Sequence, residues 1–241
     1  MSSRLHSLVI ETLGKRIVSG ELAAGATTHA EHFESELGVS RSVMREAVRV
    51  LQSLGLVESV KRIGIRVLPP ERWNKFDPSV IRWRLAADGK GVQLRSLTEL
   101  RSAVEPAAAE LAAQHSPEEM SAELMAIAAR MRAVGRAGDL QHFLELDIQY
   151  HALVLAASGN EMFAQMHSMI AEVLRGRTDY GLMPTHPHEE ALQLHVDVAD
   201  AIQSGRPEAA RQAMDQIMRR TIEEVRSVWE DEPRLFEETD A

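Results

Sequence analysis

The sequence predicts a mainly α-helical protein: a small N-terminal domain that ends in a β-hairpin, followed by an all-helical antiparallel bundle. Three observations support this fold class. Aromatic residues make up only 4% of the 241 residues, and the abundance of Ala, Leu, Val and Met favours helices over sheets. Two short strand-like runs fall close together before residue 70. Beyond Gly91 the apolar residues recur at helical spacing, without a strand pattern or an internal repeat.

The N-terminal domain is expected over residues 1–70. Helical spacing predicts three helices in it, over 4–19, 29–37 and 40–54. Ser40 offers a side chain that caps the third helix. The runs LVESV and GIRVL then predict two short strands, and Gly64 suits the tight turn between them. Three helices followed by a hairpin are the outline of a winged helix-turn-helix.

A linker with a short helix is expected over 71–90, where prolines and polar residues are frequent and Asp77-Pro78 opens the helix. The bundle is expected over 91–232, and a disordered tail over 233–241. The breaks between apolar patterns predict six helices, over 94–114, 117–135, 139–157, 160–176, 187–204 and 207–230. Short connections between them favour antiparallel packing.

Charge is unevenly spread along the chain. The net charge is −9, yet residues 1–70 hold 9 basic and 7 acidic residues, while the remainder holds 18 basic and 29 acidic residues. A slightly basic front on an acidic body fits a chain in which only the front meets a polyanion. With no cysteine, disulfides, thiolate metal sites and cysteine nucleophiles are excluded. The absence of a long apolar run and of a signal-peptide core predicts a cytoplasmic protein without a membrane partner.

The helix over 40–54 carries the strongest functional signal. At about 100° per residue its apolar residues share one face, namely Val43, Ala47, Val50, Leu51 and Leu54. Arg41, Arg45 and Arg49 fall together on the opposite face, and arginine suits both phosphate contacts and bidentate recognition of guanine. A solvated basic face on an ordinary helix is the alternative. The neighbouring short helix and hairpin favour DNA binding.

Further DNA contacts are expected on both sides of this arginine row. Ser40 and Ser42 lie at the start of the helix, where hydroxyl groups reach phosphates. Lys61 and Arg62 lie at the tip of the hairpin, and Gly64 in its turn completes the expected contact set.

Four ionisable residues fall on apolar helix faces in the second half of the chain. Asp147 and His151 share the inward side of one helix, and His195 and Arg101 lie on the inward sides of two others. Because an unpaired buried charge is costly, these groups are expected to converge on each other, a ligand or a metal. Imidazole and carboxylate are the usual nitrogen and oxygen ligands of a divalent metal such as zinc.

Each of these residues also has a purely structural interpretation. Arg101 and Glu105 have the spacing of a simple ion pair within one helix. Asp147 and His151 would form a buried hydrogen-bonded pair, and His195 would be a core histidine with a satisfied ring.

The front of the chain resembles the DNA-binding domain of the GntR family of bacterial transcription regulators. The stretch GVSRSVMREAVRVLQSLGLVESVKRIGIRV is similar to the family pattern V-S-R-x-x-x-R-E-A-L-x-x-L-x-x-x-G-L-V followed by a glycine-containing wing. The resemblance implies DNA contacts by Arg41 and Arg45, and by Arg49. Glu31 stands where the family frequently has a DNA-contacting arginine, so no contact is assigned to it.

The helical half resembles the FCD effector-binding domain of the FadR-like branch of that family. The matching segments are LRSAVEPAAAELAA, DIQYHALVLAASGN and HVDVADAIQSGRPEAARQAM. Many such domains bind a metal through one Asp and three His, and the resemblance places three of these ligands at Asp147, His151 and His195. Ile217 occupies the position of the remaining histidine. A metal would therefore have three protein ligands plus water or effector, or the site would bind the effector directly.

The resemblance also implies a function: a homodimeric, ligand-responsive repressor on a double-stranded DNA operator. Arg101 matches a position that commonly holds an effector carboxylate, and WNKFDPSVIRWRLA resembles the linker of the branch that senses sugar acids. Arg175 and Arg177 follow an apolar helix and are candidates for the cavity mouth, with surface arginines as the alternative.

Two other functions remain open at this point. A metal-dependent enzyme would use Asp147, His151 and His195 around a catalytic metal, but it leaves the winged front unexplained. A helical interaction module without a ligand would use the same residues only for stability.

Overall fold

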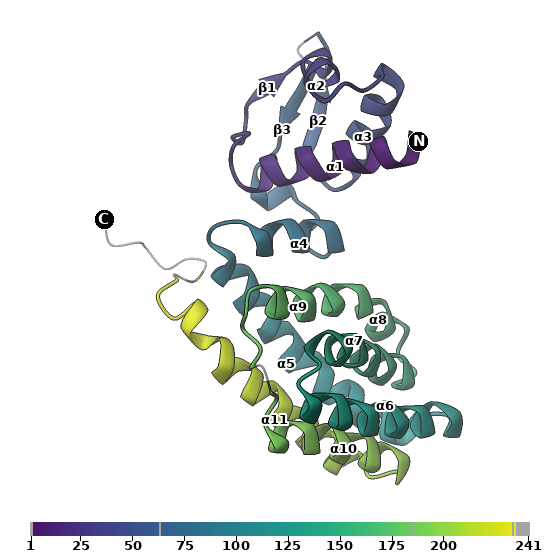
Figure 1. Cartoon of the computed structure of the whole chain (residues 1–241). Helices are drawn as coiled ribbons and strands as arrows, with labels where there is room; N and C mark the ends of the chain where they lie inside the picture. Colours follow the sequence, from purple (N-terminus) through teal and green to yellow (C-terminus); the bar gives the residue numbers. More distant parts are fainter. Residues whose placement is uncertain (1, 63, 185, 233, 235–241) are drawn as a thin grey trace. The chain divides into compact units, whose positions relative to one another are not determined.

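The structure, a computed structural model, describes residues 2–62, 64–184, 186–232 and 234. The chain forms two compact units, Met1–Lys90 and Gly91–Ala241, whose helices and strands are labelled in Figure 1. The segment expected as a separate linker, 71–90, falls within the first unit. The tail expected over 233–241 lies outside the described residues except for Arg234.

The first unit is a winged helix-turn-helix, as the sequence predicted. Its elements are α1 (Ser2–Val18), β1 (Thr27–Thr28), α2 (Ala30–Leu37), α3 (Arg41–Ser53), β2 (Val57–Val60), β3 (Gly64–Val67), the 3-10 helix η1 (Pro70–Arg72) and α4 (Pro78–Ala86). The strands form an antiparallel sheet in the order β1-β3-β2. The two-residue strand β1 was not expected, because so short a segment carries no alternating pattern.

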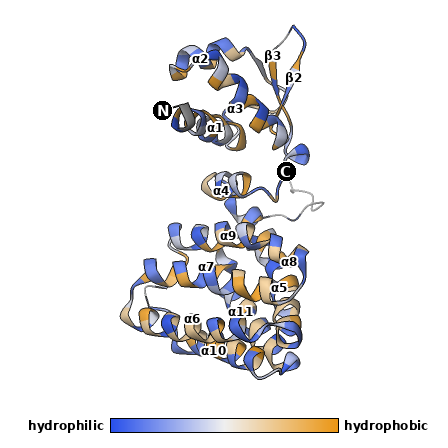
Figure 2. Ribbon diagram, turned by 90° about the vertical axis from the view of Figure 1, so that its right-hand side faces the viewer, coloured by the Kyte–Doolittle hydropathy of each residue, from blue (hydrophilic) through white to orange (hydrophobic). Residues whose placement is uncertain are grey.

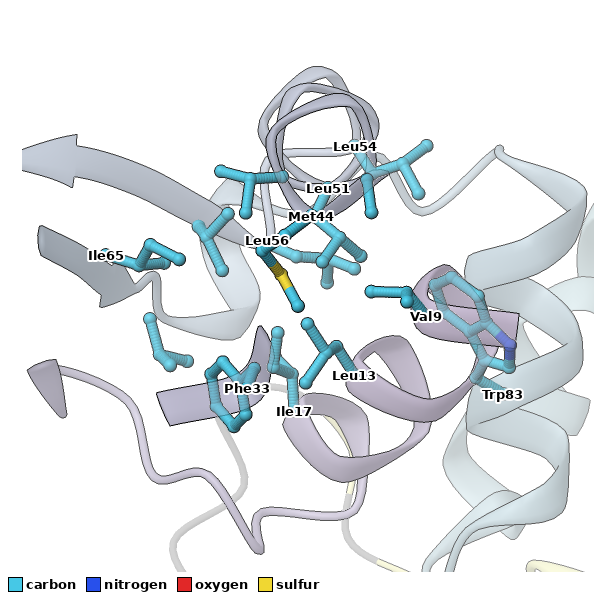
Figure 3. Packing of buried hydrophobic residues seen from close by; sticks show 14 of the residues in the cluster. Val9, Leu13, Ile17, Phe33, Met44, Leu51, Leu54, Leu56, Ile65 and Trp83 are labelled. Carbon is cyan, nitrogen blue, oxygen red and sulfur yellow. The ribbon is translucent and has the colours of Figure 1, made fainter. Parts of the chain in front are cut away.

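The core of this unit lies between α1, α3 and the sheet (Figure 3). Val9, Leu13 and Ile17 of α1 face Met44 and Leu51 of α3, and all five side chains are buried. The buried residues of α3 are Met44, Ala47, Val48 and Leu51. Val43 and Val50, expected at the centre of the apolar face, are only partly buried. The buried face is shifted because α3 packs against β2 as well as α1.

Helix α4 packs against α1. The Trp83 ring belongs to the core of the first unit, where it lies beside Val9 in Figure 3. Its Nε1 atom donates to Oε2 of Glu11 over 2.8 Å, and Arg82 pairs with the same carboxylate. Gly14 lies directly beneath the ring, since a Cβ atom added there would be 2.4 Å from it.

The second unit is helical throughout its described residues. Its elements are α5 (Lys90–His115), α6 (Glu118–Ala137), α7 (Leu140–Ala157), α8 (Glu161–Gln165), α9 (His167–Asp179), α10 (Glu189–Gln203), α11 (Pro207–Val225) and the 3-10 helix η2 (Arg226–Val228). The single helix expected over 160–176 is divided into α8 and α9 at Met166. The last long helix ends at Val225, five residues before the expected end.

Helix packing in this unit places the predicted polar residues inside the bundle. Helix α7 packs against α6 and α9, and α10 packs against α6 and α11. Figure 2 shows that these helices carry both hydrophilic and hydrophobic residues, as expected for amphipathic helices around a core. Among the described residues, none of the helices has the length and apolarity needed to cross a membrane.

Candidate functional site

The start of α3 presents polar groups on the surface of the first unit. Ser40 caps the helix, and its hydroxyl accepts from the backbone N–H of Val43. The hydroxyl oxygens of Ser40 and Ser42 lie 3.0 Å apart, and both residues are exposed. The N–H groups of a helix start and two exposed hydroxyls form a suitable phosphate-binding arrangement.

A groove runs between α2, α3 and the hairpin, and most of the predicted DNA contacts line it. Arg41, Arg45 and Arg49 line it from α3, while Arg62 and Gly64 line it from the wing. Lys61 is exposed but lies outside this lining, as do Ser40 and Ser42. The structure thus brings the arginine row and the wing tip to one concave surface.

The groove also contains residues that sequence reasoning did not select. Glu31 and Glu34 of α2 line it, so its charge is mixed rather than uniformly positive. Gln52 of α3 donates to the hydroxyl of Ser59 on β2 over 3.0 Å and ties the helix to the wing. This contact joins residues whose pairing depends on the tertiary fold, so helical spacing alone did not reveal it.

Two backbone conformations shape the wing. Arg62 has a φ of 67°, in the left-handed region, and Gly64 has a φ of 107°. A Cβ atom at Gly64 would lie 2.4 Å from the carbonyl oxygen of Thr28, so only glycine allows the close approach of β1 to the hairpin. Ile63, between them, lies outside the described residues.

The second unit contains a cavity at the centre of its bundle. It is lined from α5, α7, α9, α10, α11 and the segment before α10, and the space between the side chains amounts to about 520 Å³, part of it open to solvent. The polar lining residues are Arg101, Asp147, His151, Arg177, His188, His195, Arg220, Thr221 and Glu224. Four of the five effector-binding residues expected from the sequence are among them.

Asp147, His151 and His195 meet on one side of this cavity. Asp147 and His151 lie one turn apart on α7, and His195 faces them from α10. The Oδ1 atom of Asp147 lies 3.3 Å from Nε2 of His151 and 3.5 Å from Nε2 of His195. All three side chains are buried, and their potential ligand atoms lie within 4.8 Å of one another.

Both histidine rings are held from their far side. Nδ1 of His195 donates to the backbone carbonyl of Ala191 over 2.8 Å, because a carbonyl can only accept. Nδ1 of His151 lies 2.6 Å from Oε2 of Glu105, as an ion pair that is not aligned as a hydrogen bond. In both rings Nε2 is the nitrogen turned toward Asp147. Outer partners of this kind orient the histidines of metal sites.

Tyr150 fixes the two helices that carry these histidines. Its hydroxyl donates to the backbone carbonyl of His195 over 2.7 Å, and the side chain is fully buried. Its ring meets the rings of His151 and His195 edge-on, with centroids 5.8 and 5.2 Å apart. The spacing of the sequence placed Tyr150 on the inward face, but the contact with α10 depends on how the helices pack.

The electrostatics of the cluster favour ionised carboxylates. Burial lowers the pKa of His151, but Glu105 and Asp147 outweigh it and raise that pKa to about 9. Burial raises the pKa of Glu105, yet Arg101 and His151 bring it to about 2. Burial also raises the pKa of Asp147, but His151 and then His195 hold it well below its usual range. Two carboxylates therefore remain charged at neutral pH in a position that suits a cation.

Two buried guanidinium groups line the cavity. Arg101 is 1% exposed; it pairs with Glu105 through Nε at 2.5 Å, and its Nη1 atom has no hydrogen-bond partner among the described residues. Arg177 is 4% exposed; it pairs with Glu224 through Nη2 at 2.8 Å, while its Nε atom likewise lacks a described partner. Burial lowers the pKa of Arg177, and the charge of Arg101 lowers it further. Two cations with unused N–H groups thus face one cavity.

Arg175 does not line this cavity, in contrast to its expected role in effector binding. Its side chain is 48% exposed and pairs with Glu172 on the same helix. Positions two apart on a helix point in nearly opposite directions, so Arg177 faces inward where Arg175 faces outward. The Arg101–Glu105 ion pair, expected as the structural alternative, is present, but it is buried at the cavity wall rather than on the surface.

The Asp147, His151 and His195 donor set fits a divalent metal such as zinc. Ligand atoms around a tetrahedral zinc lie about 3.3–3.6 Å apart, because the bonds are about 2.0–2.2 Å long. Both separations measured from Asp147 agree with this edge length. Ile217 of α11 lines the same cavity and carries no donor atom. The fit therefore involves three protein ligands.

Comparison with known proteins places both units. Residues 5–67 match the description "Bacterial regulatory proteins, gntR family". Residues 96–220 match the FCD domain, which accounts for more than half of the chain. The chain belongs to the GntR family. It is a DNA-binding transcription regulator of the FadR-like branch, with a GntR helix-turn-helix followed by an FCD domain, and the metal-dependent enzyme alternative is therefore wrong.

Several relatives of this GntR-family regulator have described roles. The galactonate operon transcriptional repressor of Escherichia coli K12 is 32% identical over 209 residues, which span 85% of this chain and 90% of the repressor. The Exu regulon transcriptional regulator of the same organism is 28% identical over 199 residues, spanning 80% of this chain and 69% of that protein.

Solved structures share the fold of the GntR-family regulator at lower identity. The Listeria monocytogenes protein Lar is 17% identical, with a TM-score of 0.58 over 92% of this chain and 97% of its own. Escherichia coli McbR/YncC is 18% identical, with a TM-score of 0.55 over 93% and 98% of the two chains.

Proposed function

We propose that this regulator is a repressor that a small carboxylate, of the sugar-acid class, releases from its operator. The observation that carries the proposal is the buried Arg101 at the cavity, with an N–H group that no described residue engages. A buried guanidinium with unused donors suits a planar carboxylate. The described role of the 32% identical relative, repression of a galactonate operon, supports the sugar-acid class.

The DNA-binding half of the proposal rests on the groove of the first unit. Arg41, Arg45 and Arg49 would approach the major groove, while Lys61 and Arg62 of the wing would contact the backbone. Gly64 would allow the wing to turn, and Ser40 and Ser42 would bind phosphate at the helix start. Two copies in a homodimer would place two such surfaces on a near-palindromic operator.

The effector half rests on the cavity of the second unit. Arg101 would bind the carboxylate, with Arg177 close enough to share its charge. Asp147, His151 and His195 would hold a divalent metal such as zinc, which would supply a Lewis-acid contact to an effector oxygen. Without the metal the same polar residues would bind effector hydroxyl groups directly.

Release follows from differential binding. An effector that binds better to a form of the dimer with low operator affinity shifts the population toward that form. The coupling between the two sites equals the ratio of effector affinities in the two forms. The proposal therefore requires no contact between effector and DNA.

The test is operator release measured by fluorescence anisotropy, with DNA from the protein's own promoter region and a panel of aldonic, uronic and aldaric acids. At least one acid should release the wild-type protein. Arg101→Lys should bind DNA normally but need a concentration about 10-fold higher or more for release, because lysine cannot reproduce the bidentate contact. Arg45→Ala should lose operator affinity and keep acid binding.

Two results would contradict the proposal. Failure of the full-length protein to bind the promoter DNA even at low salt would remove the repressor role. Stabilisation by none of the acids in a thermal-shift assay, with or without zinc, would remove the effector class and favour a helical module without a ligand.

A further inference from the structure

The metal-binding side of the cavity lacks a donor at the position nearest α11. The protein offers three donor atoms from two helices, Asp147 and His151 on α7 and His195 on α10. Helix α11 also lines the cavity, but there it contributes the side chain of Ile217, which is 7% exposed and purely aliphatic. Divalent zinc normally takes four ligands, and three-ligand protein sites keep the remaining position open to an exogenous group.

The exogenous group has to come from the cavity. The three donors, Ile217 and the two buried arginines line the same enclosed space. A carboxylate bound at Arg101 would therefore lie next to the open coordination position. The other α11 residues on the cavity are no substitute, because Glu224 is engaged by Arg177 and the hydroxyl of Thr221 also faces that guanidinium.

We propose that Ile217 keeps one coordination position open for the effector, so that metal and effector each strengthen the binding of the other. The inference rests on the proposed effector site and adds a regulatory property to it. Coupling of this kind is reciprocal: the factor by which the metal raises effector affinity equals the factor by which the effector raises metal affinity. The regulator would then respond to the acid only when the metal is available.

The experiment measures zinc affinity of the full-length protein by competition with a fluorescent zinc indicator. Ile217→His and Ile217→Cys each introduce a donor that zinc accepts, and Ile217→Leu is the matched control without one. Both donor variants should bind zinc about 10- to 100-fold more tightly than wild type, whereas Ile217→Leu should match wild type. Cysteine is compatible with an apolar environment, so Ile217→Cys keeps the test valid if the histidine variant does not fold.

The second measurement repeats the zinc titration with saturating acid, using whichever acid of the panel releases DNA. Wild-type zinc affinity should rise, and the rise should be smaller in Ile217→His and Ile217→Cys because the protein then fills the open position. The acid itself should bind these variants more weakly than wild type.

Three results would overturn the inference, and they are distinguishable. Folded donor variants with wild-type zinc affinity would show that Ile217 does not face the open position. Unchanged wild-type zinc affinity in the presence of a binding acid would remove the coupling. If no acid binds, the proposed effector class and the coupling fall together, while the zinc affinities of the donor variants still decide the role of Ile217.

Discussion

At the scale of single residues, the cavity separates two arginines that the sequence places side by side. Arg177 is buried, pairs with Glu224 and has an unused Nε atom, whereas Arg175 is half exposed and pairs with Glu172. The sequence has the same residue type at both positions, and only the direction of the helix face distinguishes them. Their different surroundings make the pair a natural internal control.

We expect Arg177→Lys to lower acid affinity by about 10- to 100-fold, because lysine keeps the charge but loses the N–H fork, and one charge-assisted hydrogen bond contributes about 1.5–3 kcal/mol. Arg175→Lys should leave acid affinity unchanged. Isothermal titration calorimetry with the acid that best releases DNA measures both. Equal losses in the two variants, or none in Arg177→Lys, would exclude Arg177 from the effector site.

Residue types and spacing also determine how much of the site the sequence could predict. Asp147 and His151 are one turn apart, so the helical period alone placed them together. His195 lies on a distant helix, and its proximity followed from its apolar neighbours and the family resemblance. The contacts of Glu105 with His151 and of Tyr150 with His195 join α7 to α5 and to α10. No local pattern encodes such contacts, because they depend on how the helices pack.

At the scale of elements, the helix boundaries follow local signals more closely than apolar spacing does. Asp77 accepts from the backbone of Ser79 and begins α4 at Pro78, as the sequence indicated. The break at Met166 has no glycine or proline, which explains why a continuous helix was expected across α8 and α9. Strand β1 exists only because Thr27 and Thr28 pair with β3, so its signal lies in tertiary structure.

The contact between α1 and α4 gives a prediction for an element. Gly14→Ala would place a Cβ atom 2.4 Å from the Trp83 ring, so the ring or the helix must move. We expect this overpacking to cost about 1–3 kcal/mol of unfolding free energy, although alanine is the better helix former. Urea denaturation of the full-length protein measures the change.

The control is a double-mutant cycle with Trp83→Leu, which removes the ring that Gly14 accommodates. The Gly14→Ala substitution should cost clearly less in that background, and its helix propensity should become visible as a small gain. A cost that stays the same with leucine at position 83 would show that the ring is not the reason for glycine in α1.

At the scale of the whole molecule, the two units carry two different recognition surfaces on one chain. The first presents arginines to a polyanion, and the second encloses arginines around a small anion. The division of charge along the sequence, basic in residues 1–70 and acidic beyond, agrees with this arrangement. A repressor needs both surfaces to be linked through the equilibrium between forms of the dimer rather than through direct contact.

That link gives a prediction that involves the whole protein. If the acid weakens operator affinity by a given factor, saturating operator DNA should weaken acid affinity by the same factor, because coupling free energies are reciprocal. Calorimetric titration of the acid into free protein and into the protein–operator complex measures the second factor, and anisotropy measures the first. Arg45→Ala, which should bind acid but little DNA, should give the free-protein value in both titrations. Equal acid affinities in the free and DNA-bound wild-type protein would mean that the acid does not act by releasing the operator.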